Sequence, residues 1–83
     1  MPEKYSETDK KILLHVGEIL RQHRRMRGLT QEHVAELAGM NVTYLSDVER
    51  GKRNVSLINL ARLAKAFGMP LEDVLKGEGT AKE

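Results

Sequence analysis

The side chains best placed to recognise another molecule fall between Val42 and Arg50. A helix over this stretch, at about 100° per residue, sets Leu45 and Val48 on one side. The opposite side carries hydroxyl, carboxylate and guanidinium groups, from Thr43, Ser46, Asp47 and Arg50. These groups donate and accept hydrogen bonds, whereas no nucleophile stands at the spacing from a base that covalent catalysis requires. The stretch is therefore predicted to read a surface rather than to transform a substrate.

Cationic side chains lie on both sides of this stretch. They are Arg21, Arg24, Arg25 and Arg27 before it and Lys52 and Arg53 after it. The formal net charge is only +2 at pH 7, so the distribution of charge, rather than its total, indicates an anionic partner. A solvated charged surface is the alternative that the charges alone leave open.

Five helices with short connections are predicted to position these side chains, with no strand candidate and no internal repeat. The first covers residues 8–26 after a cap at 6–9, the second follows Thr30 and ends at Gly39, the third follows Asn41, the fourth follows Ser56 and ends at Gly68, and the short last one begins at Met69 and Pro70. These boundaries rest on capping residues followed by apolar residues at helical spacing. Gly17 costs the first helix about 1 kcal/mol relative to alanine, which indicates a close helix crossing.

The apolar residues of these helices predict a single core. Its stripes are Ile12, Leu13, Val16, Ile19, Leu20 and His23 in the first helix, Val34, Leu37 and Ala38 in the second, Leu45 and Val48 in the third, Leu57, Leu60, Ala61, Leu63, Ala64 and Phe67 in the fourth, and Leu71, Val74 and Leu75 in the last. Hydrophobic residues make up 40% of the chain, which is enough for one small domain.

The length of 83 residues argues for one domain at 8–76, with the recognition motif at 31–50 and flexible tails at 1–7 and 77–83. There is no cysteine, which excludes disulfide and thiolate chemistry. No apolar run approaches the roughly 20 residues that span a bilayer. The opening run MPEKYSETDK lacks the apolar middle of a secretory signal, so a cytoplasmic location is expected.

No arrangement of residues predicts an enzyme. There is no Ser/His/Asp spacing, no phosphate-binding glycine loop and no cluster of metal ligands. The histidines His15, His23 and His33 are scattered over two helices and fit packing or solvent exposure better than metal binding. We therefore expect no metal, no other cofactor and no small-molecule ligand.

The spacing of Gln31, Ala35, Gly39, Leu45 and Val48 resembles the helix-turn-helix of the Xre family, the lambda repressor and Cro-like regulators. The run ERGKR that follows matches this family too, and the likeness covers about residues 10 to 76. The resemblance implies an all-α, compact five-helix, lambda-repressor-like domain and a transcriptional regulator that binds double-stranded DNA at the nucleoid.

Residues 49–60 are similar in particular to the controller proteins of restriction-modification operons. Those proteins often carry an arginine, suited to a bidentate grip on guanine, just before the ThrTyr pair. Here that position is Val42. The operator is therefore expected to lack that guanine contact, and an apolar contact is expected in its place.

The major groove of B-DNA is about 12 Å wide and admits one α-helix, so the helix after Asn41 is expected to enter it. Thr43, Tyr44 and Ser46 are the leading base-reading residues, and Val42 is placed to meet a thymine methyl group. Asp47 either accepts a hydrogen bond from cytosine N4 or repels phosphate.

Phosphates are expected to be held on either side of the groove. By the resemblance, Gln31 meets the DNA backbone, aided by the partial positive charge at the start of its helix. The other predicted phosphate-binding residues are Arg50, Lys52, Arg53, Asn54 and Ser56. Local capping is an equally good explanation of Asn54 and Ser56, and both roles can hold at once.

Glu49 falls on the inward side of its helix, where an unpaired carboxylate is costly. Related proteins pair this glutamate with the arginine four residues before the glycine that closes the first helix, which is Arg24 here. The resemblance therefore implies an ion pair between Arg24 and Glu49 that fixes the angle of the recognition helix. An exposed ion pair or a phosphate contact is the alternative for Arg24.

One recognition helix covers only a few base pairs, so proteins of this kind bind as two-fold dimers with half-sites about 34 to 36 Å apart. Ile58 lies away from the main stripe of its helix, beside Arg62 and Lys65. The predicted dimer surface consists of Val55, Ile58, Ala66, Met69 and, in the last helix, Leu71. The alternative is that the last helix covers Ile58 within one chain.

The expected partners are a double-stranded DNA operator, a second copy of the chain and, as a further candidate, RNA polymerase, with no membrane. The rival function is that of a protein-interaction adaptor, coactivator or antitoxin-like, built on the same fold. The modest net charge and the acidic Asp47 leave room for that reading.

Overall fold

The computed structural model describes residues 4–76 and contains five α-helices. They are α1 (Glu7–Met26), α2 (Gln31–Ala38), α3 (Val42–Glu49), α4 (Leu57–Phe67) and α5 (Leu71–Val74). The prediction of five helices is confirmed, α1 begins one residue earlier than expected, and residues 4–76 contain no strand. The tail predicted at 77–83 and the first three residues of the tail predicted at 1–7 lie outside the described residues.

The first four helices begin at the caps predicted from the sequence. In α1 the amide of Asp9 donates to Ser6 Oγ at 3.0 Å, and the amide of Ser6 donates to the Asp9 carboxylate at 3.1 Å, which completes a capping box. The side-chain oxygens of Thr30, Asn41 and Ser56 accept backbone amides at the starts of α2, α3 and α4. Local sequence therefore fixes where these helices start.

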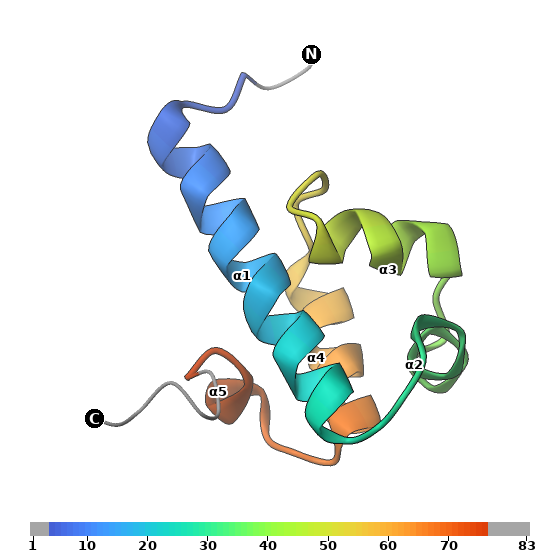
Figure 1. Ribbon diagram of the computed structural model, residues 1–83. Coiled ribbons are helices and arrows are strands. Elements are labelled where there is room, and N and C mark those ends of the chain that lie inside the picture. Colours follow the sequence, from blue (N-terminus) through green and yellow to red (C-terminus); the bar gives the residue numbers. More distant parts are fainter. Residues whose placement is uncertain (1–3, 77–83) are drawn as a thin grey trace.

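One core draws on all five helices. In Figure 1, α1 passes in front of α4, with α2 and α3 to one side and α5 to the other. Each helix contributes a fully buried side chain: Leu20, Val34, Leu45, Leu63 and Val74. Burying a side chain of this size stabilises the fold by about 1.5–3 kcal/mol relative to leaving it in water.

Four residues predicted to lie in the core are exposed instead. Ile12 and Leu37 are each 54% exposed, Leu57 is 69% exposed and Leu75 is 47% exposed. Leu57 and Leu75 lie at the ends of their helices, and Ile12 lies in the first half of α1. At these positions the apolar side of the helix extends beyond the neighbouring helices that would cover it. In the short α2, Val34, Ala35 and Ala38 already form the buried side, which leaves Leu37 outside.

His23 is the buried residue of α1 that holds α5 in place. Its Nε2 donates to the carbonyl oxygen of Val74 at 2.8 Å, across 51 positions of sequence. The ring also packs beside Phe67 of α4, with 5.5 Å between the ring centroids. Because α5 has only four residues, attachment to α1 substitutes for the stability that a longer helix would have.

Gly17 marks the crossing of α1 and α3. A Cβ atom built on Gly17 would lie 2.5 Å from the carbonyl oxygen of Val48 and 2.6 Å from that of Glu49. These are backbone atoms of α3, so they can move away only if the whole helix shifts. The close crossing expected from the sequence is therefore present.

Replacing Gly17 by alanine should destabilise the protein although alanine favours a helix. The gain in helix propensity is about 1 kcal/mol, whereas overpacking against the α3 backbone costs about 1–3 kcal/mol and displaces α3. His15→Ala, at an exposed position of the same helix, is the matched control and should leave stability nearly unchanged. Urea denaturation of both variants measures the effect, and a Gly17→Ala protein more stable than the wild type would contradict it.

Candidate nucleic-acid interface

The outward side of α3 presents the polar side chains singled out in the sequence. Thr43 and Arg50 are exposed, and Ser46 and Asp47 are half-buried. On the inward side, Leu45 and Val48 are 1% and 2% exposed. The helix is therefore anchored by one side and open along the other.

The turn between α2 and α3 sets the direction in which α3 starts. Gly39 takes a left-handed conformation with φ 69°, which lets the chain turn immediately after α2. Asn41 then accepts the amides of Thr43 at 2.7 Å and Tyr44 at 3.4 Å. These bonds satisfy two of the amides that a helix start leaves unpaired.

Asp47 and Arg50 form an ion pair on the open side of α3. The guanidinium Nη2 of Arg50 donates to the Asp47 carboxylate at 2.6 Å. The arginine side chain is 52% exposed and the aspartate side chain 25% exposed. The negative charge of Asp47 is thus offset by the residue that caps the end of α3, so this surface is not acidic.

Val42 and Tyr44 lie on the flanks of α3 rather than on its open side. Both are half-buried and packed against the core. The hydroxyl oxygen of Tyr44 accepts a hydrogen bond from Asn59 Nδ2 of α4 at 3.1 Å, and the Arg53 guanidinium lies 5.0 Å from the centre of the tyrosine ring. The five residues predicted to read bases therefore divide into an open set, Thr43, Ser46 and Asp47, and a flanking set.

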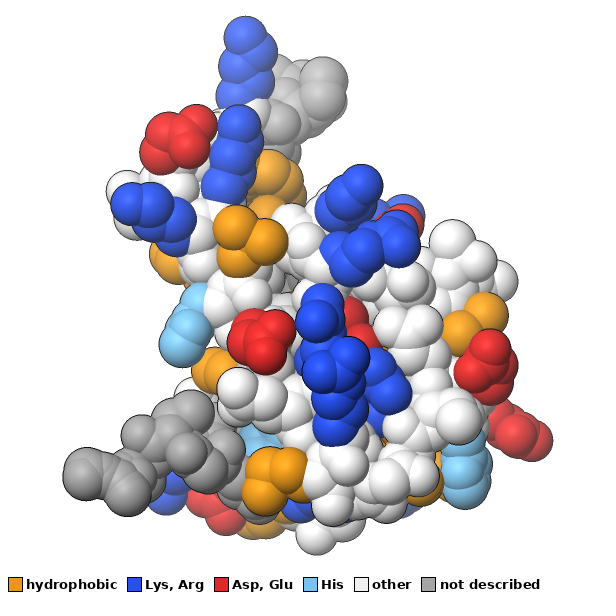
Figure 2. All heavy atoms as spheres, viewed as in Figure 1, with side chains coloured by type: hydrophobic (Ala, Val, Ile, Leu, Met, Phe, Trp, Pro, Cys, Tyr) orange, Lys and Arg blue, Asp and Glu red, His pale blue; other side chains and the backbone are white. Residues whose placement is uncertain are grey.

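The predicted phosphate-binding residues that follow α3 gather in one loop. Lys52, Arg53, Asn54 and Ser56 are all exposed. Ser56 Oγ also accepts the amide of Asn59 at 3.0 Å, so its capping role is realised while the hydroxyl remains at the surface. Figure 2 shows Lys and Arg side chains gathered over the end of α3 with this loop and over the second half of α1.

Arg24 and Glu49 form a largely buried ion pair on the inward side of α3. Arg24 Nε donates to Glu49 Oε2 at 2.7 Å and Arg24 Nη2 donates to Glu49 Oε1 at 3.0 Å. The two side chains are 13% and 2% exposed. Arg24 Nη1 also donates to the Leu29 carbonyl at 2.9 Å, so one guanidinium joins α1, α3 and the segment that leads into α2.

The pKa of Arg24 is raised above its ordinary value, chiefly because its guanidinium donates to Glu49. A cation with a raised pKa contributes its full stability below the ordinary pKa and loses it only as the pH rises beyond that value. Arg24 therefore stays charged, and its part in the ion pair stays constant, throughout the neutral range.

Gln31, expected at a phosphate, also binds the buried carboxylate. Its Nε2 donates to Glu49 Oε1 at 2.9 Å, so Glu49 accepts from α1 and from α2. No pattern in the sequence indicates this bond, because residues 31 and 49 belong to different helices whose relative placement sets the distance. Gln31 is half-buried and lies at the start of α2.

The arginines near the end of α1 divide between the interior and the surface. Arg27 Nε donates to the Phe67 carbonyl at 2.9 Å, and its guanidinium lies 5.5 Å from the centre of the Phe67 ring. Arg24 and Arg27 therefore serve the packing of the helices. Arg25 is exposed and Arg21 is half-buried. Arg21 Nη1 forms an ion pair with Glu18 Oε1 at 3.8 Å.

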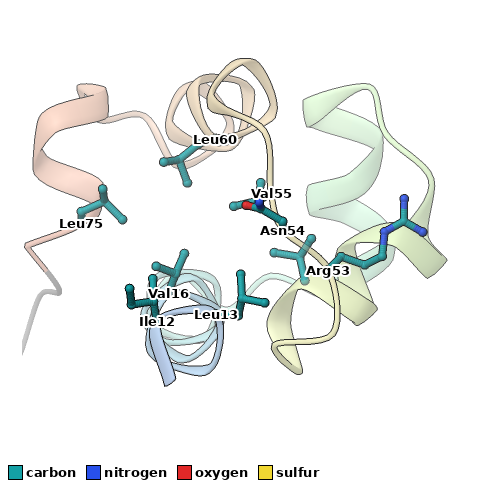
Figure 3. Close-up of a pocket in the computed structure, with 9 residues that line it drawn as sticks. Ile12, Leu13, Val16, Arg53, Asn54, Val55, Leu60 and Leu75 are labelled. Atoms are coloured by element: carbon teal, nitrogen blue, oxygen red, sulfur yellow. The ribbon is translucent and has the colours of Figure 1, made fainter. Parts of the chain in front are cut away.

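The residues predicted for a dimer surface differ in exposure. Ile58 is 63% exposed, so the alternative in which α5 covers it within one chain is wrong. Val55, Ala66, Met69 and Leu71 are half-buried and packed against the core. Close by, Val55 lines an apolar hollow of about 150 Å³ between α1, α4 and the end of α5, in which Ile12, Leu60 and Leu75 point toward one another (Figure 3).

Two further observations concern other kinds of site. No group of three or more histidine, aspartate or glutamate side chains within residues 4–76 could hold a metal ion. Across the same residues, every helix is too short or too polar to traverse a lipid bilayer.

Residues 20–74 match the model of the helix-turn-helix family HTH_3. The control protein C.SmaI of Serratia marcescens is 38% identical over 68 residues, which are 82% of this chain and 81% of that protein. The HTH-type transcriptional regulator DdrOP3 of Deinococcus deserti is 45% identical over 60 residues, 72% of this chain, and the chain spans only 46% of that relative's length. The crystal structure of the restriction-modification controller protein C.AhdI from Aeromonas hydrophila superimposes with a TM-score of 0.75 at 41% identity, covering 77% of this chain and 97% of that one.

The described chain is an all-α domain of five helices, in which an ion pair lies on the inward side of α3 and the opposite side of α3 is open. This is the lambda-repressor-like helix-turn-helix fold, as predicted. The chain belongs to the HTH_3 family, the Xre/Cro-like DNA-binding transcriptional regulators, and is not an enzyme.

Replacing Glu49 by alanine should cost about 3–5 kcal/mol, because it leaves the largely buried guanidinium of Arg24 without its partner. The double variant Arg24→Met, Glu49→Leu removes both charges and should recover most of that loss. Urea denaturation of the single and double variants measures both effects. A loss below about 1 kcal/mol in the single variant, typical of exposed pairs, would show that the pair is not buried in solution.

Proposed function

We propose that the chain is a transcriptional regulator that binds a palindromic or pseudopalindromic operator as a homodimer, with α3 of each subunit in the major groove. The observation that supports this most strongly is the fixed outward side of α3, where Thr43 and Arg50 are exposed while Glu49 behind them is buried and paired. A helix held this way can present its polar side chains to base edges without rearranging.

Base reading is assigned to the open set. Hydroxyl groups such as those of Thr43 and Ser46 can donate to or accept from base edges, and the threonine methyl can pack against a thymine methyl. Asp47 can accept a hydrogen bond from cytosine N4 once Arg50 leaves the Asp47 carboxylate and binds a phosphate instead. Val42 offers no hydrogen bond, so the operator is expected to differ from those of controllers that carry arginine at this position.

Phosphate binding is assigned to two groups of residues beside α3, one at the start of α2 and one in the loop after α3. Gln31 stands at the start of α2, where the partial positive charge of the helix favours an anion. Lys52, Arg53 and Asn54 are exposed in the loop between the end of α3 and the start of α4. Contacts of this kind give affinity and salt dependence without sequence preference.

Dimerisation is assigned to the exposed apolar residues around the start of α4. Leu57 and Ile58 are 69% and 63% exposed, and a second copy related by a two-fold axis would cover both. Two recognition helices then fit half-sites about 34 to 36 Å apart. Because the relatives C.SmaI and C.AhdI are named control or controller proteins, we propose control of a restriction-modification operon as the biological setting, with RNA polymerase as a further partner.

Selection from a random duplex pool at about 50 and 200 mM salt tests this function. The regulator should enrich a palindrome and bind it much less tightly at the higher salt concentration. A protein-interaction adaptor should enrich nothing, and that outcome would overturn the proposal.

Two substitutions should separate base reading from phosphate binding on the enriched duplex. Thr43→Ala should relax specificity at one base step by about 1–3 kcal/mol, whereas Arg53→Ala should weaken all sequences alike and lower the salt slope by about 1. Affinities for a panel of single-base operator variants provide the measurement. A uniform loss in both proteins would contradict the division of roles.

Ile58→Glu should weaken self-association by roughly 100-fold, since each subunit loses the burial of one side chain, about 1.5 kcal/mol. Sedimentation equilibrium measures the change. Leu37→Glu is the matched control, because Leu37 is a similarly exposed apolar residue, on α2. Equal dissociation constants for the wild type and the Ile58→Glu variant would place the dimer surface elsewhere.

A further inference from the structure

We propose that Tyr44 and Asn59 are positioning residues that hold Arg53 at the DNA backbone, and that Tyr44 does not read bases. The inference rests on the proposed function, because it concerns the same contact with duplex DNA. The sequence alone predicts that Tyr44 reads bases, whereas here Tyr44 has a positioning role, and Asn59, which had no predicted role, shares it.

The three side chains form a continuous chain of contacts from α4 to the loop after α3. Asn59 Nδ2 donates to the Tyr44 hydroxyl oxygen at 3.1 Å. The Arg53 guanidinium lies 5.0 Å from the centre of the Tyr44 ring, within the range of a cation–π interaction. The backbone of Asn59 is itself fixed, because its amide donates to Ser56 Oγ at 3.0 Å.

The orientation of Tyr44 argues against base reading. It follows Thr43 by one residue, which turns it by about 100° around the helix. Its ring packs against the core, and its one polar atom is engaged by α4. A side chain held at both its ring and its hydroxyl has to break these contacts before it can reach a base edge.

Arg53 retains its charge for a partner outside the chain. Within residues 4–76 no carboxylate forms an ion pair with Arg53, in contrast to Arg24 and Arg50, which pair with Glu49 and Asp47. Figure 3 shows the Arg53 side chain extending away from the apolar hollow toward α3. Its direction is therefore set by the tyrosine ring while its charge remains uncompensated.

Stacking matters because a free arginine side chain samples many rotamers and loses that freedom on binding. Contact with Tyr44 restricts those rotamers before DNA arrives, which lowers the entropic cost of the phosphate contact. Because Asn59 and Ser56 belong to the start of α4, the same contacts tie the position of the phosphate-binding loop to that of α3.

The test compares binding of the wild type and of variants to the duplex enriched from the random pool and to a scrambled duplex of equal length, over a series of salt concentrations. Arg53→Ala should weaken binding to both duplexes by roughly three- to tenfold at 0.1 M salt. Tyr44→Leu should weaken binding to both duplexes by roughly two- to fivefold, because the exposed cation–π contact that restricts Arg53 before binding is lost. The double variant should bind no more weakly than Arg53→Ala alone, within about twofold.

The salt slope separates positioning from a merely structural role. Tyr44→Leu should lower the slope toward that of Arg53→Ala, since a phosphate contact is lost, whereas a variant that only destabilises the fold leaves the slope of its folded fraction unchanged. Asn59→Ala keeps the ring and the fold intact, so it repeats the test if Tyr44→Leu unfolds. Asn59→Ala should weaken binding to both duplexes alike, and it should not change binding further in a protein that already carries Arg53→Ala.

A change of roughly fivefold or more in the ratio of operator to scrambled affinity for Tyr44→Leu would show that Tyr44 reads a base and would overturn the inference. Independent, multiplying losses in the double variant would overturn it too. Thr43→Ala is the control that should change this ratio. If the wild type itself binds neither duplex, the proposed function is wrong. That result comes from the wild type alone and is therefore distinct from a failure of the inference about Tyr44 and Asn59.

Discussion

The orientation of the open side of α3 depends on the carboxylate of Glu49. Its side chain is 2% exposed and accepts hydrogen bonds from Arg24 of α1 and Gln31 of α2. A buried charge is tolerated only while its partners stay in place, so these bonds hold three helices in one relative arrangement. Gly17 makes this possible, because only a residue without Cβ lets α1 approach the carbonyls of α3 so closely. The open side of α3 takes its direction from this buried arrangement.

A helix of eight residues has little stability of its own, and both flanks of α3 are tied to neighbours by polar contacts. Glu49 faces α1 and α2, and Tyr44 faces α4 through Asn59. The apolar residues Leu45 and Val48 fill the space between these flanks. Hydrophobic burial supplies the stability of this attachment, while the polar bonds, which need defined distances and angles, set its rotation.

Membership of the HTH_3 family accounts for the scaffold, and under the proposed function the choice of operator falls to a few side chains. Fold alone does not determine what such a domain reads. The chain's own features are the apolar Val42 beside the open side of α3 and the pairing of Asp47 with Arg50. A change at these positions alters the surface without disturbing the buried carboxylate behind it.

The helices, their caps and the residues on the open side of α3 could be derived from the amino-acid sequence alone. Caps at Ser6, Thr30, Asn41 and Ser56 could be predicted because each bond joins atoms two or three residues apart, where the local backbone sets the geometry. The ion pair of Arg24 and Glu49 followed from family resemblance rather than from spacing. Three features could be seen only in the folded chain: Gln31 reaches Glu49, Tyr44 meets Asn59, and Ile12 and Leu57 lie outside the core. These contacts and exposures depend on the angles and offsets between helices, which arise from the packing of the whole core and which no periodicity within a single helix encodes.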